Sequence, residues 1–278
     1  MTVERGDARL SALFDVTRTA GRAALVGYLP AGFPTLEASA DTLSAMVDGG
    51  CDLVEVGVPY SDPVLDGAAI QAAAETARGN GFRLRDMFTV VERVAAAGGR
   101  AVVMTYFNPI LAYGVDKFAR DVAAAGGLGV ITADLIVDEA DQWLAATDAS
   151  GLAPIFLVAP SSSAERISLT AAVTGGFLYA ASTMGVTGAR DKVSPEAQAL
   201  VARCRELTDL PIGVGLGVRT GVQAAQIAAF ADAVIVGSAF VSAATEGPAA
   251  VARLAAELAD GVREPRPAEP AQSLAGGR

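Results

Sequence analysis

Eight short apolar runs alternate with segments of helical spacing and divide this chain into units of roughly thirty residues, the size of a β-strand plus an α-helix. The runs are apolar almost without interruption, which is typical of parallel strands covered on both faces. They lie at 23–29, 53–57, 101–106, 129–131, 154–158, 177–180, 212–215 and 233–236. Helical patterns between them lie at 35–47, 84–97, 115–125, 138–146, 164–172, 195–207 and 222–230.

Eight units of this kind predict an α/β fold, a (β/α)8 barrel of the TIM type, because a doubly wound sheet usually ends at five or six strands. Leu10, Leu13 and Phe14 have helical spacing and predict an extra N-terminal helix that covers the bottom of the barrel. We therefore expect a single barrel domain over residues 1–262. Residues 263–278 contain three prolines and little to bury, which predicts a disordered tail.

The chain contains no histidine, so acid–base chemistry must use other groups. Glu55 is the strongest candidate, because it lies in the apolar run 53–57, where desolvation would raise its pKa toward ~6 to 7. A glutamate satisfied by backbone amides or by an arginine explains the same position without chemistry.

Other acids and a tyrosine follow the predicted strand ends, which meet at one mouth of a parallel barrel. Asp62 and Asp66 lie after the second strand, Asp134 after the fourth, and Tyr179 in the sixth. Asp62 between Ser61 and Pro63 also suits a local turn, and Asp134 also suits a helix cap.

Residues 182–192 carry glycines, small hydroxyls and charges after the sixth strand, which suits a lid, although an ordinary surface connection would explain the same composition.

Glycines end the seventh strand at 213–218, and the eighth strand leads into a short helix with Ser238 near its start. Backbone amides and a helix dipole there predict an anion site that needs no lysine, with tight helix packing as the alternative.

A net charge of −10 and scattered basic residues exclude a nucleic-acid partner. No run is long enough to span a membrane and the N-terminus lacks a signal-like apolar stretch, so we expect a cytoplasmic protein. Cys51 and Cys204 form no redox or zinc motif and suit the core, and without histidine we expect no metal.

Six ordered motifs make the chain resemble the tryptophan synthase alpha subunit family over roughly residues 8 to 262. They are G-Y-L-P-A-G-F-P (27–34), L-V-E-V-G-V-P-Y-S-D-P-V-L-D-G (53–67), M-T-Y-F-N-P-I (104–110), Y-A-A-S-T-M-G-V-T-G (179–188), V-G-L-G-V (214–218) and V-I-V-G-S-A (234–239). Other phosphate-binding barrels share the late glycines but not the segment around Glu55.

The resemblance implies a lyase that needs no cofactor and splits indole-3-glycerol phosphate into indole and glyceraldehyde 3-phosphate. Glu55 and Asp66 would be the catalytic pair, with Glu55 transferring protons and Asp66 polarising the indole N–H. The other roles implied are Tyr28 beside the indole, Tyr179 near Glu55, Thr187 beside Asp66, and a phosphate site of Gly188, Gly217, Gly237 and Ser238.

Family members work in an α2β2 heterotetramer and pass indole to a pyridoxal-phosphate beta subunit. The resemblance implies that Tyr106, Asn108 and Pro109, after the third strand, meet that partner, although the residues alone indicate a plain turn. A non-catalytic activating subunit is the alternative, and the presence of Glu55 and Asp66 argues against it. Another sugar-phosphate isomerase or aldolase would require a lysine or a metal cluster at the strand ends, and the predicted strands contain no lysine.

Overall fold

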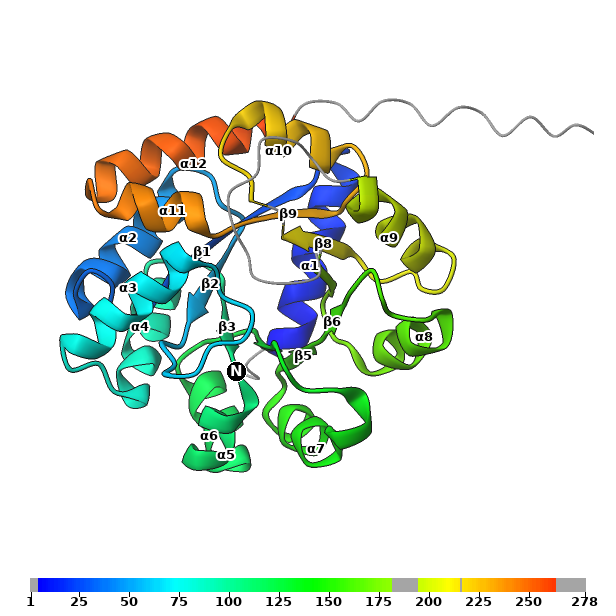
Figure 1. Ribbon diagram of the computed structural model, residues 1–278, viewed down its shortest axis with the longest axis horizontal. Coiled ribbons are helices and arrows are strands. Elements are labelled where there is room, and N and C mark those ends of the chain that lie inside the picture. Colours follow the sequence, from blue (N-terminus) through cyan, green and yellow to red (C-terminus); the bar gives the residue numbers. More distant parts are fainter. Residues whose placement is uncertain (1–4, 182–194, 216, 264–278) are drawn as a thin grey trace, which may run out of the picture.

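A computed structural model describes residues 5–181, 195–215 and 217–263 (Figure 1). Its elements alternate between strands and helices along the chain. In order they are α1 (Gly6–Thr19), β1 (Ala24–Pro30), α2 (Leu36–Asp48), β2 (Leu53–Gly57), α3 (Ala68–Gly79), α4 (Leu84–Ala96), β3 (Ala101–Thr105), α5 (Phe107–Tyr113), α6 (Val115–Ala124), β4 (Gly129–Thr132), the 3-10 turn η1 (Val137–Glu139), α7 (Asp141–Ser150), β5 (Ala153–Ile155), β6 (Leu157–Val158), α8 (Ala164–Val173), β7 (Leu178–Ala181), α9 (Pro195–Arg205), β8 (Ile212–Gly215), α10 (Gly221–Ala228), β9 (Ala233–Val236), α11 (Ser238–Ala244) and α12 (Pro248–Arg263).

The strands form one parallel sheet in the order β5-β4-β3-β2-β1-β9-β8-β7-β6. The two strands at the ends of this order, β5 and β6, are separated in the chain only by Phe156. The sheet therefore curves round on itself, with the helices outside it (Figure 1). The predicted (β/α)8 barrel is confirmed.

The fifth predicted strand, 154–158, is divided in the structure. β5 pairs with β4, whereas β6 pairs with β7, and the backbone changes partner at Phe156. The carbonyl of Phe156 accepts a hydrogen bond from the amide of Tyr179, which continues the ladder on the second side. The interruption is thus the place where the barrel closes.

Helix α1 closes the barrel at the N-terminal ends of its strands. Leu10, Leu13 and Phe14 are buried in the same cluster as inward-facing residues that begin strands, including Ala24 and Leu53. The N-terminal helix and its packing face were predicted from these three apolar positions, and both are confirmed.

Three helices were not predicted: α3, α5 and α12. The apolar spacing of α3 and α12 was present in the sequence, since each helix buries residues three, four and seven positions apart. In α3 these are Ile70, Ala73, Ala74 and Ala77. In α12 they are Val251, Ala255, Leu258, Ala259 and Val262.

Helix α5 stands where a turn was expected. Pro109 is its third residue, a position where a missing N–H breaks no intrahelical bond. The Oδ1 of Asp134 accepts the amide of Phe107 at 2.7 Å, so Asp134 caps α5 rather than the helix that follows it. Asp134 can do this because it follows β4, which lies beside β3, the strand that precedes α5.

Of the predicted tail, Arg263 is helical as the last residue of α12. Residues 264–278 lie outside the described residues. Among the helices that the structure describes, none is long and apolar enough to cross a membrane.

Candidate active site

Glu55 points into the barrel because of its place in β2. Side chains alternate across a strand, and Leu53, two residues earlier, belongs to the inward-facing cluster. In the ladder Glu55 is level with Tyr28 of β1 and Val102 of β3. The carboxyl group therefore lies on the inner wall, two residues before β2 ends at the mouth.

The environment of Glu55 favours its neutral form. The residue is 1% exposed, and its Oε1 has no hydrogen-bond partner within the described part of the chain. Burial raises the pKa of Glu55 to about 8. A carboxyl group with this pKa holds a proton at neutral pH and can still release it, which is what a general acid requires.

Tyr28 and Tyr179 stand beside Glu55 on the inner wall. Burial raises the pKa of both phenols well above 10, and the negative charges of Asp66 and Glu55 raise each of them further. Each ring crosses a glycine of the next strand: a Cβ added at Gly57 would collide with the Tyr28 hydroxyl, and one at Gly215 with the Tyr179 hydroxyl. These glycines make room for the two phenols.

Asp66 lies half-buried in the loop between β2 and α3. Burial raises its pKa, and a hydrogen bond from the Tyr106 hydroxyl partly opposes that rise. Tyr106 is 5% exposed, and burial together with the charge of Asp66 raises its own pKa to about 12. Tyr106 thus remains protonated beside Asp66.

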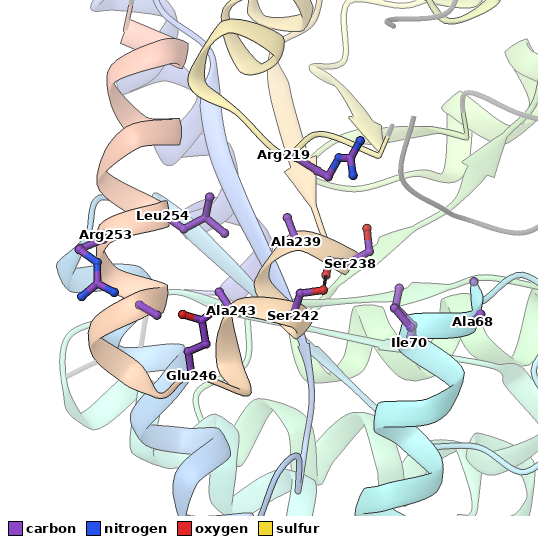
Figure 2. A pocket seen from close by; sticks show the side chains of 13 residues that line it. Ala68, Ile70, Arg219, Ser238, Ala239, Ser242, Ala243, Glu246, Arg253 and Leu254 are labelled. Atoms are coloured by element: carbon purple, nitrogen blue, oxygen red, sulfur yellow. Dashed lines mark hydrogen bonds between the residues drawn. The ribbon is translucent and has the colours of Figure 1, made fainter. Parts of the chain in front are cut away.

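A pocket of about 640 Å³ lies next to these residues, where α3 and α11 begin (Figure 2). Gly67, Ala68 and Ile70 line it from the start of α3, and Ser238 from the start of α11. Ile70 also approaches Gly237, whose other near neighbour is Tyr28. Gly237 therefore links the pocket to the inner wall.

The predicted anion site is brought together in part. Ser238 lines the pocket, Gly237 precedes α11, and Gly217 turns the chain after β8 with a φ of +26°. Arg219, two residues after Gly217, also lines the pocket (Figure 2) and was missed. Its place just after the glycines of the seventh barrel strand was the available signal.

The predicted partner-binding residues separate into two groups. Tyr106 is buried and bonded to the loop of Asp66, so its contacts are internal. Asn108 is exposed and Pro109 half-exposed on α5. The amide of Asn108 donates to the hydroxyl of Tyr60 at 2.8 Å, a residue that the sequence had not singled out.

Two further predicted residues, Thr187 and Gly188, and the predicted lid at 182–192 lie outside the described residues. Asp62 is exposed and accepts a hydrogen bond from the Ser61 hydroxyl, in keeping with a local turn. In the ranges that the structure describes, no three His, Cys, Asp or Glu side chains form a group that could hold a metal ion.

Comparison with known proteins identifies the family. The sequence model for the tryptophan synthase alpha chain matches residues 14–265. The chain belongs to the tryptophan synthase alpha chain family. The alpha chain of Mycobacteroides abscessus is 62% identical over 255 residues, which are 92% of this chain and 97% of that protein. The alpha chain of Nocardia farcinica is also 62% identical, over 92% of this chain and 96% of its own length.

Solved structures agree with this assignment. A tryptophan synthase structure from Mycobacterium tuberculosis superposes with a TM-score of 0.89 at 59% identity, over 92% of this chain and 98% of that one. The alpha subunit from Legionella pneumophila strain Paris gives 0.83 at 31% identity, over 91% and 98%. The chain is accordingly a carbon–carbon lyase of tryptophan biosynthesis that cleaves indole-3-glycerol phosphate. The alternative of a non-catalytic activating subunit receives no support.

Proposed function

We propose that Glu55 and Asp66 are the catalytic pair that splits indole-3-glycerol phosphate into indole and glyceraldehyde 3-phosphate. The burial of Glu55 carries this proposal. Its carboxyl group is buried on the inner wall with one oxygen unpartnered within the described residues, and its pKa is raised to about 8. Asp232 is the other acid that is buried within the described residues. Unlike Glu55, it is bonded to an arginine, Arg205, and to the amide of Ile212, at the opposite end of the strands.

The reaction needs one proton delivered and one removed. Protonated Glu55 donates to C3 of the indole ring, which forms an indolenine-like cation whose N–H is stabilised by the Asp66 carboxylate. The bond between C3 and the glycerol carbon then breaks, and its electron pair returns to the ring to give neutral indole. The glycerol hydroxyl loses its proton to the Glu55 carboxylate as the aldehyde forms, so Glu55 ends the reaction protonated.

The remaining residues bind and orient the substrate in this proposal. Tyr28 and Tyr179 flank the indole, since both lie on the inner wall beside Glu55. Gly217, Gly237 and Ser238 hold the phosphate with their amides, assisted by the cation of Arg219 at the pocket. Thr187 and Gly188 would complete the site from the segment after β7.

The chain works with a tryptophan synthase beta chain, which receives the indole. We further propose that residues 1–262 form one lyase domain and that the protein is cytoplasmic. Cys51 and Cys204 support that location, because both are buried free thiols, as expected in a reducing compartment.

Glu55→Gln tests the catalytic assignment, because the amide keeps the shape and loses the transferable proton. We expect at least a ~100-fold loss of indole release from indole-3-glycerol phosphate by the complex with a beta chain. Glu37→Gln, the same change at an exposed position of α2, is the matched control. Retention of more than about a tenth of the activity by Glu55→Gln would exclude Glu55 as the proton-transfer group.

A further inference from the structure

One phenol oxygen fixes the backbone that presents Asp66. The Tyr106 hydroxyl oxygen accepts the amide of Val64 at 3.2 Å and that of Leu65 at 3.0 Å. The same hydroxyl also interacts with the Asp66 carboxyl group and lowers its pKa. The two amides that come just before Asp66 are therefore held by a single buried atom.

A second tyrosine joins this oxygen to the surface. The ring of Tyr60 packs against the ring of Tyr106, with centroids 5.3 Å apart and planes inclined by 35°. The Tyr60 hydroxyl accepts the side-chain amide of Asn108 at 2.8 Å, and Asn108 is exposed on α5. The contacts therefore run from Asn108 through Tyr60 and Tyr106 to the two backbone amides just before Asp66.

These contacts connect three separate segments of the chain. Tyr60 and Asp66 belong to the loop after β2, Tyr106 follows β3, and Asn108 lies in the first turn of α5, which Asp134 caps from the end of β4. Moving the Asn108 amide would remove the donor to Tyr60. Because the two rings are packed together, a shift of Tyr60 would displace Tyr106 and with it the backbone that presents Asp66.

We propose that Tyr60 is a positioning residue that transmits the state of the exposed Asn108 amide to Asp66 through Tyr106. The proposal rests on the role of Asp66 given above and adds a route by which a partner that binds α5 reaches that carboxylate. One hydrogen bond, from Asn108 to Tyr60, carries the coupling, which limits the size of the effect. Loss of such a bond changes an equilibrium by about fivefold.

A simpler role for Tyr60 is ring packing alone. Tyr60→Phe separates the two, because phenylalanine keeps the ring on Tyr106 and removes only the acceptor for Asn108. Tyr106→Phe likewise keeps the ring and removes the oxygen that binds the amides of Val64 and Leu65 and lowers the pKa of Asp66. Tyr113→Phe is the matched control, since its hydroxyl also lies on α5 but bonds to Asp121.

The test measures the pKa of Asp66 directly, by carboxyl carbon NMR of the full chain labelled at aspartate. Tyr106→Phe removes a donor to the carboxylate, so we expect the pKa of Asp66 to rise by about one unit. Tyr60→Phe and Asn108→Ala should each raise it by a few tenths of a unit. None of these variants replaces Glu55, Tyr28 or Tyr179, the other ionisable groups of the site.

The decisive comparison is Asn108→Ala made in the Tyr60→Phe chain. If Tyr60 transmits the effect, Asn108→Ala adds no further shift there, and Tyr113→Phe causes none in any background. Tyr60→Phe with an unchanged Asp66 pKa, or an undiminished Asn108→Ala shift in its presence, would overturn the proposal. The NMR readout needs no turnover, whereas failure of the complex to cleave indole-3-glycerol phosphate would instead contradict the proposed function.

Discussion

Tyr28 of β1 is level with Glu55 of β2 in the parallel ladder, so a buried phenol and a buried carboxyl share the inner wall of the barrel. Neither side chain is more than 7% exposed. Burial, ahead of the charges of Asp66 and Glu55, raises the pKa of Tyr28, and burial also raises the pKa of Glu55 to about 8. Both groups are therefore protonated at neutral pH.

The rate of cleavage should therefore fall in alkaline solution. In the proposed mechanism Glu55 must carry a proton to begin the reaction, and burial raises its pKa to about 8. We expect kcat/KM for indole-3-glycerol phosphate to decrease tenfold for each pH unit once the pH is well above that value. A pH profile of the complex checks this, and a flat profile between pH 7 and 10 would contradict it.

The same pKa predicts a pH-dependent stability. The pKa of Glu55 is higher in the folded chain than in the unfolded chain. Its contribution to the free energy of unfolding is therefore complete below about pH 4.5 and is lost as the pH rises through about 8. Glu55→Gln should remove this loss and be the more stable protein at pH 9, by on the order of a few kcal/mol. Urea denaturation at pH 6 and pH 9 measures the difference, with Glu37→Gln as the exposed control.

Asp66→Asn should lower kcat by about 100-fold, because in the proposed mechanism the carboxylate stabilises the positive indolenine ring and a neutral amide cannot. Asp62→Asn, in the same loop but exposed, should have little effect. Steady-state kinetics separate the two possible roles of Asp66. A change in KM with kcat retained would make it a binding residue.

Ser238→Asp should weaken substrate binding about tenfold or more, because it sets a fixed negative charge in the pocket where we propose that the phosphate binds. Ser238→Ala keeps the backbone amide and should cost less than about threefold. Inhibition by glyceraldehyde 3-phosphate measures both. Equal inhibition of the wild type and Ser238→Asp would locate the phosphate elsewhere.

Asn108→Asp should reduce activation by the beta chain more than it reduces the basal rate of the isolated chain. The substitution introduces a charge on the exposed face of α5 and replaces the amide donor to Tyr60. Asn80→Asp makes the same chemical change at the end of α3. Cleavage rates with and without the beta chain test this, and equal losses in both assays would mean that Asn108 serves the active site alone.

Most of the barrel could be predicted because burial on both strand faces leaves a strong mark on the sequence. β2, β8 and β9 begin and end where the apolar runs do, and Leu10, Leu13 and Phe14 indicated the helix beneath the barrel. The division at Phe156 could not be read from that pattern, since it depends on which strands lie on either side.

The site was predictable where a residue conflicts with its local surroundings. Glu55 is such a case, as an acid within an apolar strand. Tyr106 is not, because its hydroxyl serves backbone amides whose positions depend on the folded loop. Helix α5 was not predicted either, because a seven-residue segment with a proline in its first turn looks like a plain turn. The residue that caps it, Asp134, also comes from a different unit of the barrel.

The sheet order has a consequence for synthesis on the ribosome. β1 pairs with β2 on one side and with β9 on the other. The first strand to be synthesised therefore completes its pairing only after the last strand has been made. Until residue 236 has emerged, one edge of β1 presents unpaired amides and carbonyls to the cell. The nascent chain is thus exposed to wrong pairing for almost the whole of translation, and chaperone dependence should be greatest just before β9 appears.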